Sequence, residues 1–97
     1  MNHEDALKAL AKYREQVDAI DRELLTLLNR RTSVVEQIGR VKEEVHLPIY
    51  EPKREADVFH NVTVNNHGPL SAEALQRIFE RIIDEMRSLQ RMRREGD

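Results

Sequence analysis

The first half of the chain carries an apolar residue at almost every third or fourth position. From Leu10 to Val45, ten of the eleven positions on this spacing are apolar, and only Arg31 breaks the pattern. Such a period predicts one amphipathic helix with a heptad seam, over approximately residues 4–45. The helix should end before Leu47, because Pro48 disfavours the α conformation in the residue before it.

Two shorter helices are predicted after this segment. Pro52 suits a first helical position, so the second helix is expected over approximately residues 52–66, with Gly68 as a left-handed cap residue in the following turn. Ser71 is a good N-cap for a third helix over approximately residues 71–93. Its apolar residues at helical spacing are Leu75, Ile78, Phe79, Ile82, Ile83, Met86 and Leu89. We therefore expect an all-α fold of three helices per chain, in a single domain over residues 1–97.

The length of the first helix is the reason to expect a second chain. A helix of about 40 residues is about 60 Å long, whereas a compact globule of this size has a radius of gyration of only about 12–13 Å. The rest of the chain is too short to cover such an apolar stripe. The sequence therefore predicts an intertwined homodimeric helical bundle, most simply with two-fold symmetry.

Composition narrows the possible functions. The chain has 16 Lys and Arg against 18 Asp and Glu, and this balance disfavours a nucleic-acid partner. It has no Cys, which excludes a disulfide scaffold, a thiolate metal site and a cysteine nucleophile. The four His residues have no metal-ligand spacing. No apolar run approaches the roughly 20 residues that span a bilayer, and the N-terminus lacks a signal-peptide pattern, so no membrane association and a cytoplasmic location are expected.

Arg31 and Lys42 are the first candidates for binding chemistry. Arg31 stands inside the apolar seam, where its stem could pack while its charge reaches solvent or a carboxylate; alternatively, it faces an internal cavity that receives an anion. Lys42 alone would be a surface residue. However, it lies three turns after Arg31 and is rotated by only about 20°, so both side chains could converge on a small ligand.

Four further polar residues are candidates. Arg14 cannot share that pocket on one straight helix, but it could do so from a partner subunit; otherwise it pairs with surface acids. Gln90 is either solvated at a helix boundary or donates a hydrogen bond into the pocket. Glu55 suits the first turn of a helix, whereas Arg54 has no such local reason. Cations beside apolar faces indicate a pocket for a small dianion, in a binding module or in an enzyme that acts by electrostatics.

Three stretches of the sequence closely resemble the all-helical chorismate mutases: YREQVDAIDRELLTLLNRRTSVVEQIGRVK, LPIYEPKREADVF and GPLSAEALQRIFERIIDEMRSLQ. The resemblance extends from about residue 7 to residue 91. It implies an intertwined dimer of three-helix chains that converts chorismate to prephenate without a metal or cofactor. The sequence also looks like the mutase domains fused to other enzymes of aromatic amino-acid biosynthesis, so such an enzyme is a possible fused or associated partner.

The resemblance implies catalytic roles for Arg31, Lys42 and Gln90. Arg31, together with Arg14 from the other subunit, would clamp the two carboxylates of chorismate. Lys42 and Gln90 would donate hydrogen bonds to the ether oxygen, where negative charge grows as the carbon–oxygen bond breaks.

The remaining substrate-binding roles follow from the same resemblance. Glu55 would accept a hydrogen bond from the ring hydroxyl, with help from the backbone near Glu51. Arg54 would support a carboxylate or hydroxyl contact. Met86 stands where some family members have a Ser that contacts a carboxylate, so that contact would be lost or supplied otherwise.

Two other functions stay open. An isochorismate pyruvate lyase on the same fold would use a similar cationic pocket, and Arg14, Arg31, Lys42 and Gln90 do not discriminate between the two enzymes. The connector before the second helix resembles that of a mutase more closely. A non-catalytic dimeric domain that senses chorismate or prephenate would bind its ligand without turnover.

Overall fold

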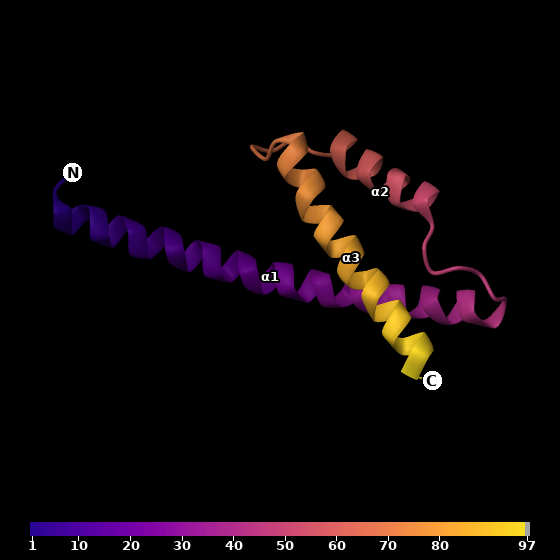
Figure 1. Cartoon of the computed structure of the whole chain (residues 1–97). Helices are drawn as coiled ribbons and strands as arrows, with labels where there is room; N and C mark the ends of the chain where they lie inside the picture. Colours follow the sequence, from indigo (N-terminus) through magenta and orange to yellow (C-terminus); the bar gives the residue numbers. More distant parts are fainter. Residues whose placement is uncertain (97) are drawn as a thin grey trace. The chain divides into compact units, whose positions relative to one another are not determined.

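The computed structural model describes residues 1–96, which form three α-helices and no strand (Figure 1). Helix α1 spans His3–Glu44, α2 spans Pro52–Val64 and α3 spans Ala72–Gly96. The prediction of an all-α chain with a long first helix is confirmed. The end of α3 differs most from its expected position, because the helix continues beyond residue 93 to Gly96.

The chain divides into two units, Met1–Ser33 and Val34–Asp97. The first unit holds most of α1. The second holds the last part of α1, a connector over residues 45–51, and the helices α2 and α3. Within the second unit α2 and α3 contact each other (Figure 1).

Local capping explains where the helices begin and end. Pro52 opens α2, as predicted, and the Ser71 hydroxyl accepts a hydrogen bond from the backbone N–H of Ala74 at 3.1 Å, as expected of an N-cap. His46, with φ of 58°, is the residue that takes the left-handed conformation after α1. The chain leaves the helix there because Pro48 keeps Leu47 out of the α region.

The prediction that Gly68 is a left-handed cap is wrong. No glycine among the described residues has a positive φ, and the C-cap residue of α2 is Asn65, with φ of −94°. Asn66 closes the turn instead: its side-chain oxygen accepts from the Gly68 N–H at 3.2 Å, and its amide donates to the Leu70 carbonyl at 2.8 Å. An asparagine side chain can fix a turn in this way without unusual backbone angles.

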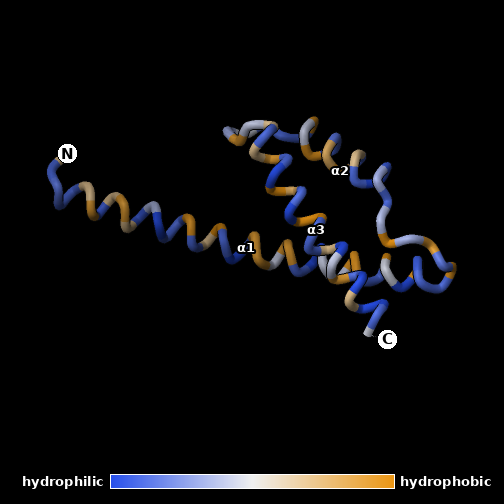
Figure 2. The backbone as a smooth tube through the Cα atoms, in the orientation of Figure 1, coloured by the Kyte–Doolittle hydropathy of each residue, from blue (hydrophilic) through white to orange (hydrophobic). Residues whose placement is uncertain are grey.

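Apolar side chains remain largely uncovered. Ile83, 8% exposed, is the only buried hydrophobic residue in the described part of the chain. The hydrophobic residues of α1 recur once per turn (Figure 2). Those that remain exposed are Leu7, Leu10, Tyr13, Val17, Ile20, Leu24, Leu25 and Leu27 in the first unit and Val34, Ile38 and Val41 in the second. Exposed apolar surface of this kind is typical of an interaction face.

Within residues 1–96, no helix combines the length and the apolar character that crossing a membrane requires.

The cap at Ser71 can be tested directly. We expect Ser71→Ala to lower the free energy of unfolding by about 1 kcal/mol, because one N–H at the start of α3 loses its partner. Ser88→Ala is the matched control, since Ser88 is exposed in the middle of the same helix and alanine is a better helix former there. Urea unfolding followed by circular dichroism measures both. Equal effects of the two substitutions would contradict the capping role.

Candidate functional site

Lys42 is a buried cation in the last turn of α1. It is only 8% exposed, which is unusual for lysine. Its ammonium donates to the Ile49 carbonyl at 2.9 Å and pairs with the Glu51 carboxylate at 2.6 Å. Both partners belong to the connector that follows α1. An ammonium has three N–H donors, so these two contacts leave one donor for another acceptor.

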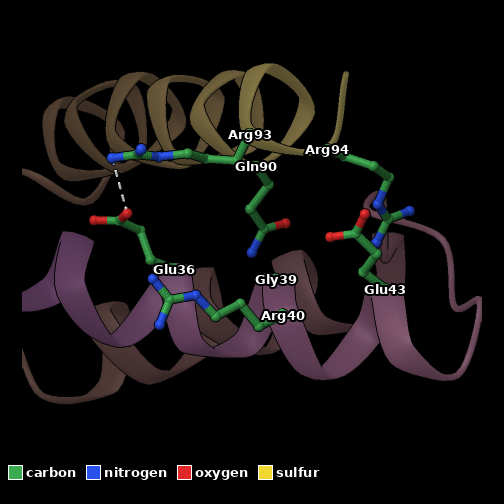
Figure 3. Close-up of a pocket in the computed structure, with 7 residues that line it drawn as sticks. All are labelled: Glu36, Gly39, Arg40, Glu43, Gln90, Arg93 and Arg94. Atoms are coloured by element: carbon green, nitrogen blue, oxygen red, sulfur yellow. Dashed lines mark ion pairs between the residues drawn. The ribbon is translucent and has the colours of Figure 1, made fainter. Parts of the chain in front are cut away.

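Gln90 reaches from α3 to the backbone of α1 (Figure 3). Its amide nitrogen donates to the Val35 carbonyl at 3.2 Å. Gly39 permits this approach, because a Cβ there would lie only 3.3 Å from the Gln90 Cγ atom. A side-chain amide has two N–H donors, so Gln90 also keeps one donor beyond this contact.

A hollow of about 180 Å³ lies beside Gln90, between α1 and α3 (Figure 3). It is lined by Glu36, Gly39, Arg40, Glu43, Gln90, Arg93 and Arg94. Arg93 pairs with Glu36 at 3.0 Å, and Arg94 donates to the Leu47 carbonyl at 3.1 Å. Gln90 is the only sequence-predicted site residue that lines the hollow.

Glu55, in the first turn of α2, forms an ion pair that the sequence analysis missed. Arg87 of α3 donates to both carboxylate oxygens, with the Nη2–Oε1 distance at 2.6 Å. Both side chains are about three-quarters buried. The guanidinium also lies over the ring of Tyr50, 4.9 Å from its centroid. The hydrogen bond to Glu55 raises the pKa of Arg87 above its ordinary value, although burial opposes this.

A sequence signal for Arg87 did exist. Arg87 stands four residues after Ile83 and three before Gln90, which places it on the same face of α3 as both. A charged residue there breaks the apolar pattern of the third helix as Arg31 breaks that of the first. Its partner could not be predicted from the pattern, because Glu55 lies 32 residues away in the sequence.

The other predicted residues are distributed over both units. Arg54 is exposed on α2, and Met86 is half-buried on α3 one turn before Gln90. Arg14 and Arg31 belong to the first unit, where Arg14 is exposed and Arg31 is half-buried. Of the predicted site residues, Lys42 and Glu51 of the second unit form an ion pair with each other.

No group of three or more His, Asp or Glu side chains within residues 1–96 is arranged as a metal site.

A family model and a curated protein match this chain. The model described as chorismate mutase type II matches residues 13–91. The bifunctional chorismate mutase/prephenate dehydratase of Aquifex aeolicus is 35% identical over 89 residues, which cover 88% of this chain and 25% of that protein. The chain thus spans about a quarter of the length of this relative.

Solved structures are similar over a larger share of their own length. Form II of chorismate mutase from Thermus thermophilus superposes with a TM-score of 0.83 at 35% identity, covering 86% of this chain and 94% of that one. Chorismate mutase from Helicobacter pylori, solved in complex with prephenate, gives a TM-score of 0.80 at 30% identity, covering 87% and 91%.

The burial of Lys42 predicts how strongly its partner matters for stability. Glu51→Gln should lower the free energy of unfolding by about 1–3 kcal/mol, because a mostly buried ammonium loses a charged hydrogen-bond partner. Glu85→Gln is the control. Glu85 pairs with Arg81 at a similar 2.7 Å, but both side chains are more than half exposed, so we expect a loss of at most about 0.5 kcal/mol. A control loss as large as that of Glu51→Gln, in chemical unfolding, would contradict the difference in burial.

Proposed function

The chain belongs to the chorismate mutase type II family, and we propose that it rearranges chorismate to prephenate. The reaction is pericyclic, so no nucleophile, metal or cofactor takes part. An enzyme that catalyses this reaction has to hold the substrate in a reactive conformation and stabilise the charge that develops at the ether oxygen. We propose that residues 1–97 act as one mutase-type domain.

The observation that carries this proposal is the buried ammonium of Lys42. Negative charge grows on the ether oxygen as the carbon–oxygen bond breaks, so a donor already aimed at that oxygen stabilises the transition state more than the bound substrate. Lys42 is 8% exposed and is held by Ile49 and Glu51, so its position is fixed before substrate binds. Its third N–H and the second amide N–H of Gln90 are the two donors that we assign to the ether oxygen.

The two carboxylates of chorismate require cations other than Lys42, because Lys42 and Gln90 are assigned to the ether oxygen. We assign them to Arg31 of one subunit and Arg14 of a second subunit in a homodimer. Guanidinium groups bind carboxylates through two parallel hydrogen bonds, and this clamp would hold the substrate in a near-attack geometry. The exposed apolar residues of α1 support the homodimer, since a second copy would cover them.

The remaining contacts involve the connector and α2. We assign the ring hydroxyl to the Glu55 carboxylate and to the backbone near Glu51, and a supporting contact to Arg54. Met86 supplies an apolar side chain where some members of the family have a Ser that contacts a carboxylate.

The curated relatives suggest a partner activity. The Aquifex aeolicus relative joins a chorismate mutase to a prephenate dehydratase in one protein. That arrangement supports the proposal that prephenate made by this chain passes to another aromatic-pathway enzyme, either fused to it or in a complex.

Turnover of chorismate is the test of the proposed function. The purified chain should consume chorismate, measured by loss of its absorbance, and NMR should identify the product as prephenate. Lys42→Met keeps the aliphatic stem but removes the donor, so we expect kcat to fall by about 10²–10³-fold. Binding of chorismate without its consumption would favour a sensing domain, and release of pyruvate from isochorismate would favour the lyase. Full activity in Lys42→Met would overturn the assigned donor.

The amide of Gln90 predicts a characteristic pH dependence. An amide does not titrate, so donation by Gln90 should persist across neutral pH. Gln90→Glu donates only when its carboxyl is protonated, and an unperturbed Glu has a pKa of about 4.3. The variant should therefore lose activity as the pH rises from about 5 to about 8, while the parent chain changes little. A flat pH–rate profile for Gln90→Glu would contradict the role of donor.

A further inference from the structure

Each of the three guanidinium nitrogens of Arg87 lies near a carboxylate oxygen. Its Nε atom donates to the Glu55 Oε2 at 3.2 Å, and its Nη2 atom donates to Oε1 at 2.6 Å and to Oε2 at 2.5 Å. The third nitrogen, Nη1, lies 3.5 Å from a carboxylate oxygen of Asp84. One side of the Glu55 carboxylate is therefore held by a planar fork, which fixes its orientation as well as its charge.

Tyr50 holds the same guanidinium from another direction. The Arg87 Cζ atom lies 4.9 Å from the centroid of the Tyr50 ring, within the range of a cation–π contact. Tyr50 stands in the connector between Ile49 and Glu51, the two residues that hold Lys42. Three consecutive connector residues thus contact two cations, one on α1 and the other on α3.

The ion pair with Arg87 restricts the conformations of the Glu55 side chain, which would be flexible without a partner. Ordering a glutamate side chain costs conformational entropy. Arg87 removes that freedom before any ligand binds, and both pair members are about three-quarters buried. Each carboxylate oxygen has two lone-pair sites, so the side chain held by Arg87 can still accept a further hydrogen bond.

We propose that Arg87 is a positioning residue that fixes the Glu55 carboxylate to accept the ring hydroxyl of the substrate. The proposal rests on the proposed function, in which Glu55 binds that hydroxyl. Arg87 itself touches no substrate. Two other roles of Arg87 would give different results. The ion pair could serve only to join α2 to α3, or Arg87 could compete with the substrate for the Glu55 carboxylate.

The decisive experiment compares two substrates in the full chain. The first is chorismate, and the second is its analogue with hydrogen in place of the ring hydroxyl. For Arg87→Met we expect kcat/KM for chorismate to fall by about tenfold, the size of a coupling between groups in direct contact. The analogue offers no hydroxyl to Glu55, so its kcat/KM should change by less than about twofold.

Arg81→Met is the matched control. Arg81 lies on the same helix in an ion pair with Glu85, but its side chain is 78% exposed. We expect this variant to retain the parent kcat/KM for both substrates. Arg87→Lys keeps the charge but loses the planar fork, and it should fall between the parent and Arg87→Met for chorismate, which keeps the test usable if Arg87→Met folds poorly.

The double variant Arg87→Met/Glu55→Gln, compared with the two single variants, gives a double-mutant cycle for the ion pair. If Arg87 acts through Glu55, adding Arg87→Met to Glu55→Gln should lower kcat/KM for chorismate by less than about twofold further. Equal losses for both substrates would overturn the proposal in favour of a structural pair, and a gain of activity in Arg87→Met would overturn it in favour of competition. Failure of the parent chain to turn over chorismate would instead reject the proposed function itself.

Discussion

By itself the chain covers only a small part of its apolar surface, and this shortage determines how the rest of the molecule is built. Burial of apolar side chains is the main favourable term in folding, yet Ile83 is the only hydrophobic residue buried within residues 1–96. The exposed apolar residues of α1 therefore need a second apolar surface to cover them. In the proposed homodimer, the same requirement that stabilises the fold would also bring Arg14 of one subunit to the site of the other, so folding, assembly and substrate binding would have one origin.

The second unit holds two cations, Lys42 and Arg87, in or beside its apolar faces. Lys42 is as buried as Ile83, at 8% exposed, and a buried charge requires compensation. The connector supplies it through Glu51 and the Ile49 carbonyl, while Tyr50 lies beside Arg87. A short segment between α1 and α2 thereby holds the proposed catalytic donor and contacts the arginine that orients Glu55. For a reaction accelerated by fixed donors, such rigidity is itself a catalytic property.

Periodicity predicted the helices well, because it depends only on local geometry and on the spacing of apolar residues. It also singled out Lys42, whose spacing from Arg31 set it apart from a surface lysine. The pattern could not supply the partners. The contact of Glu55 with Arg87 joins residues 32 positions apart, and the bond from Gln90 to the Val35 carbonyl depends on the close approach that Gly39 allows. The prediction for Gly68 is wrong because an Asn66 side chain can close a turn as effectively as a left-handed glycine.

Mixed dimers test whether the proposed site is built from residues of two subunits. Arg14→Ala and Arg31→Ala chains, each inactive alone, should regain chorismate mutase activity when they exchange subunits. In a mixed dimer one site carries both substitutions and the other carries neither, so a statistical mixture should recover about a quarter of the parent activity if subunits pair at random. No recovery, with exchange verified by native mass spectrometry, would contradict a site built from both chains.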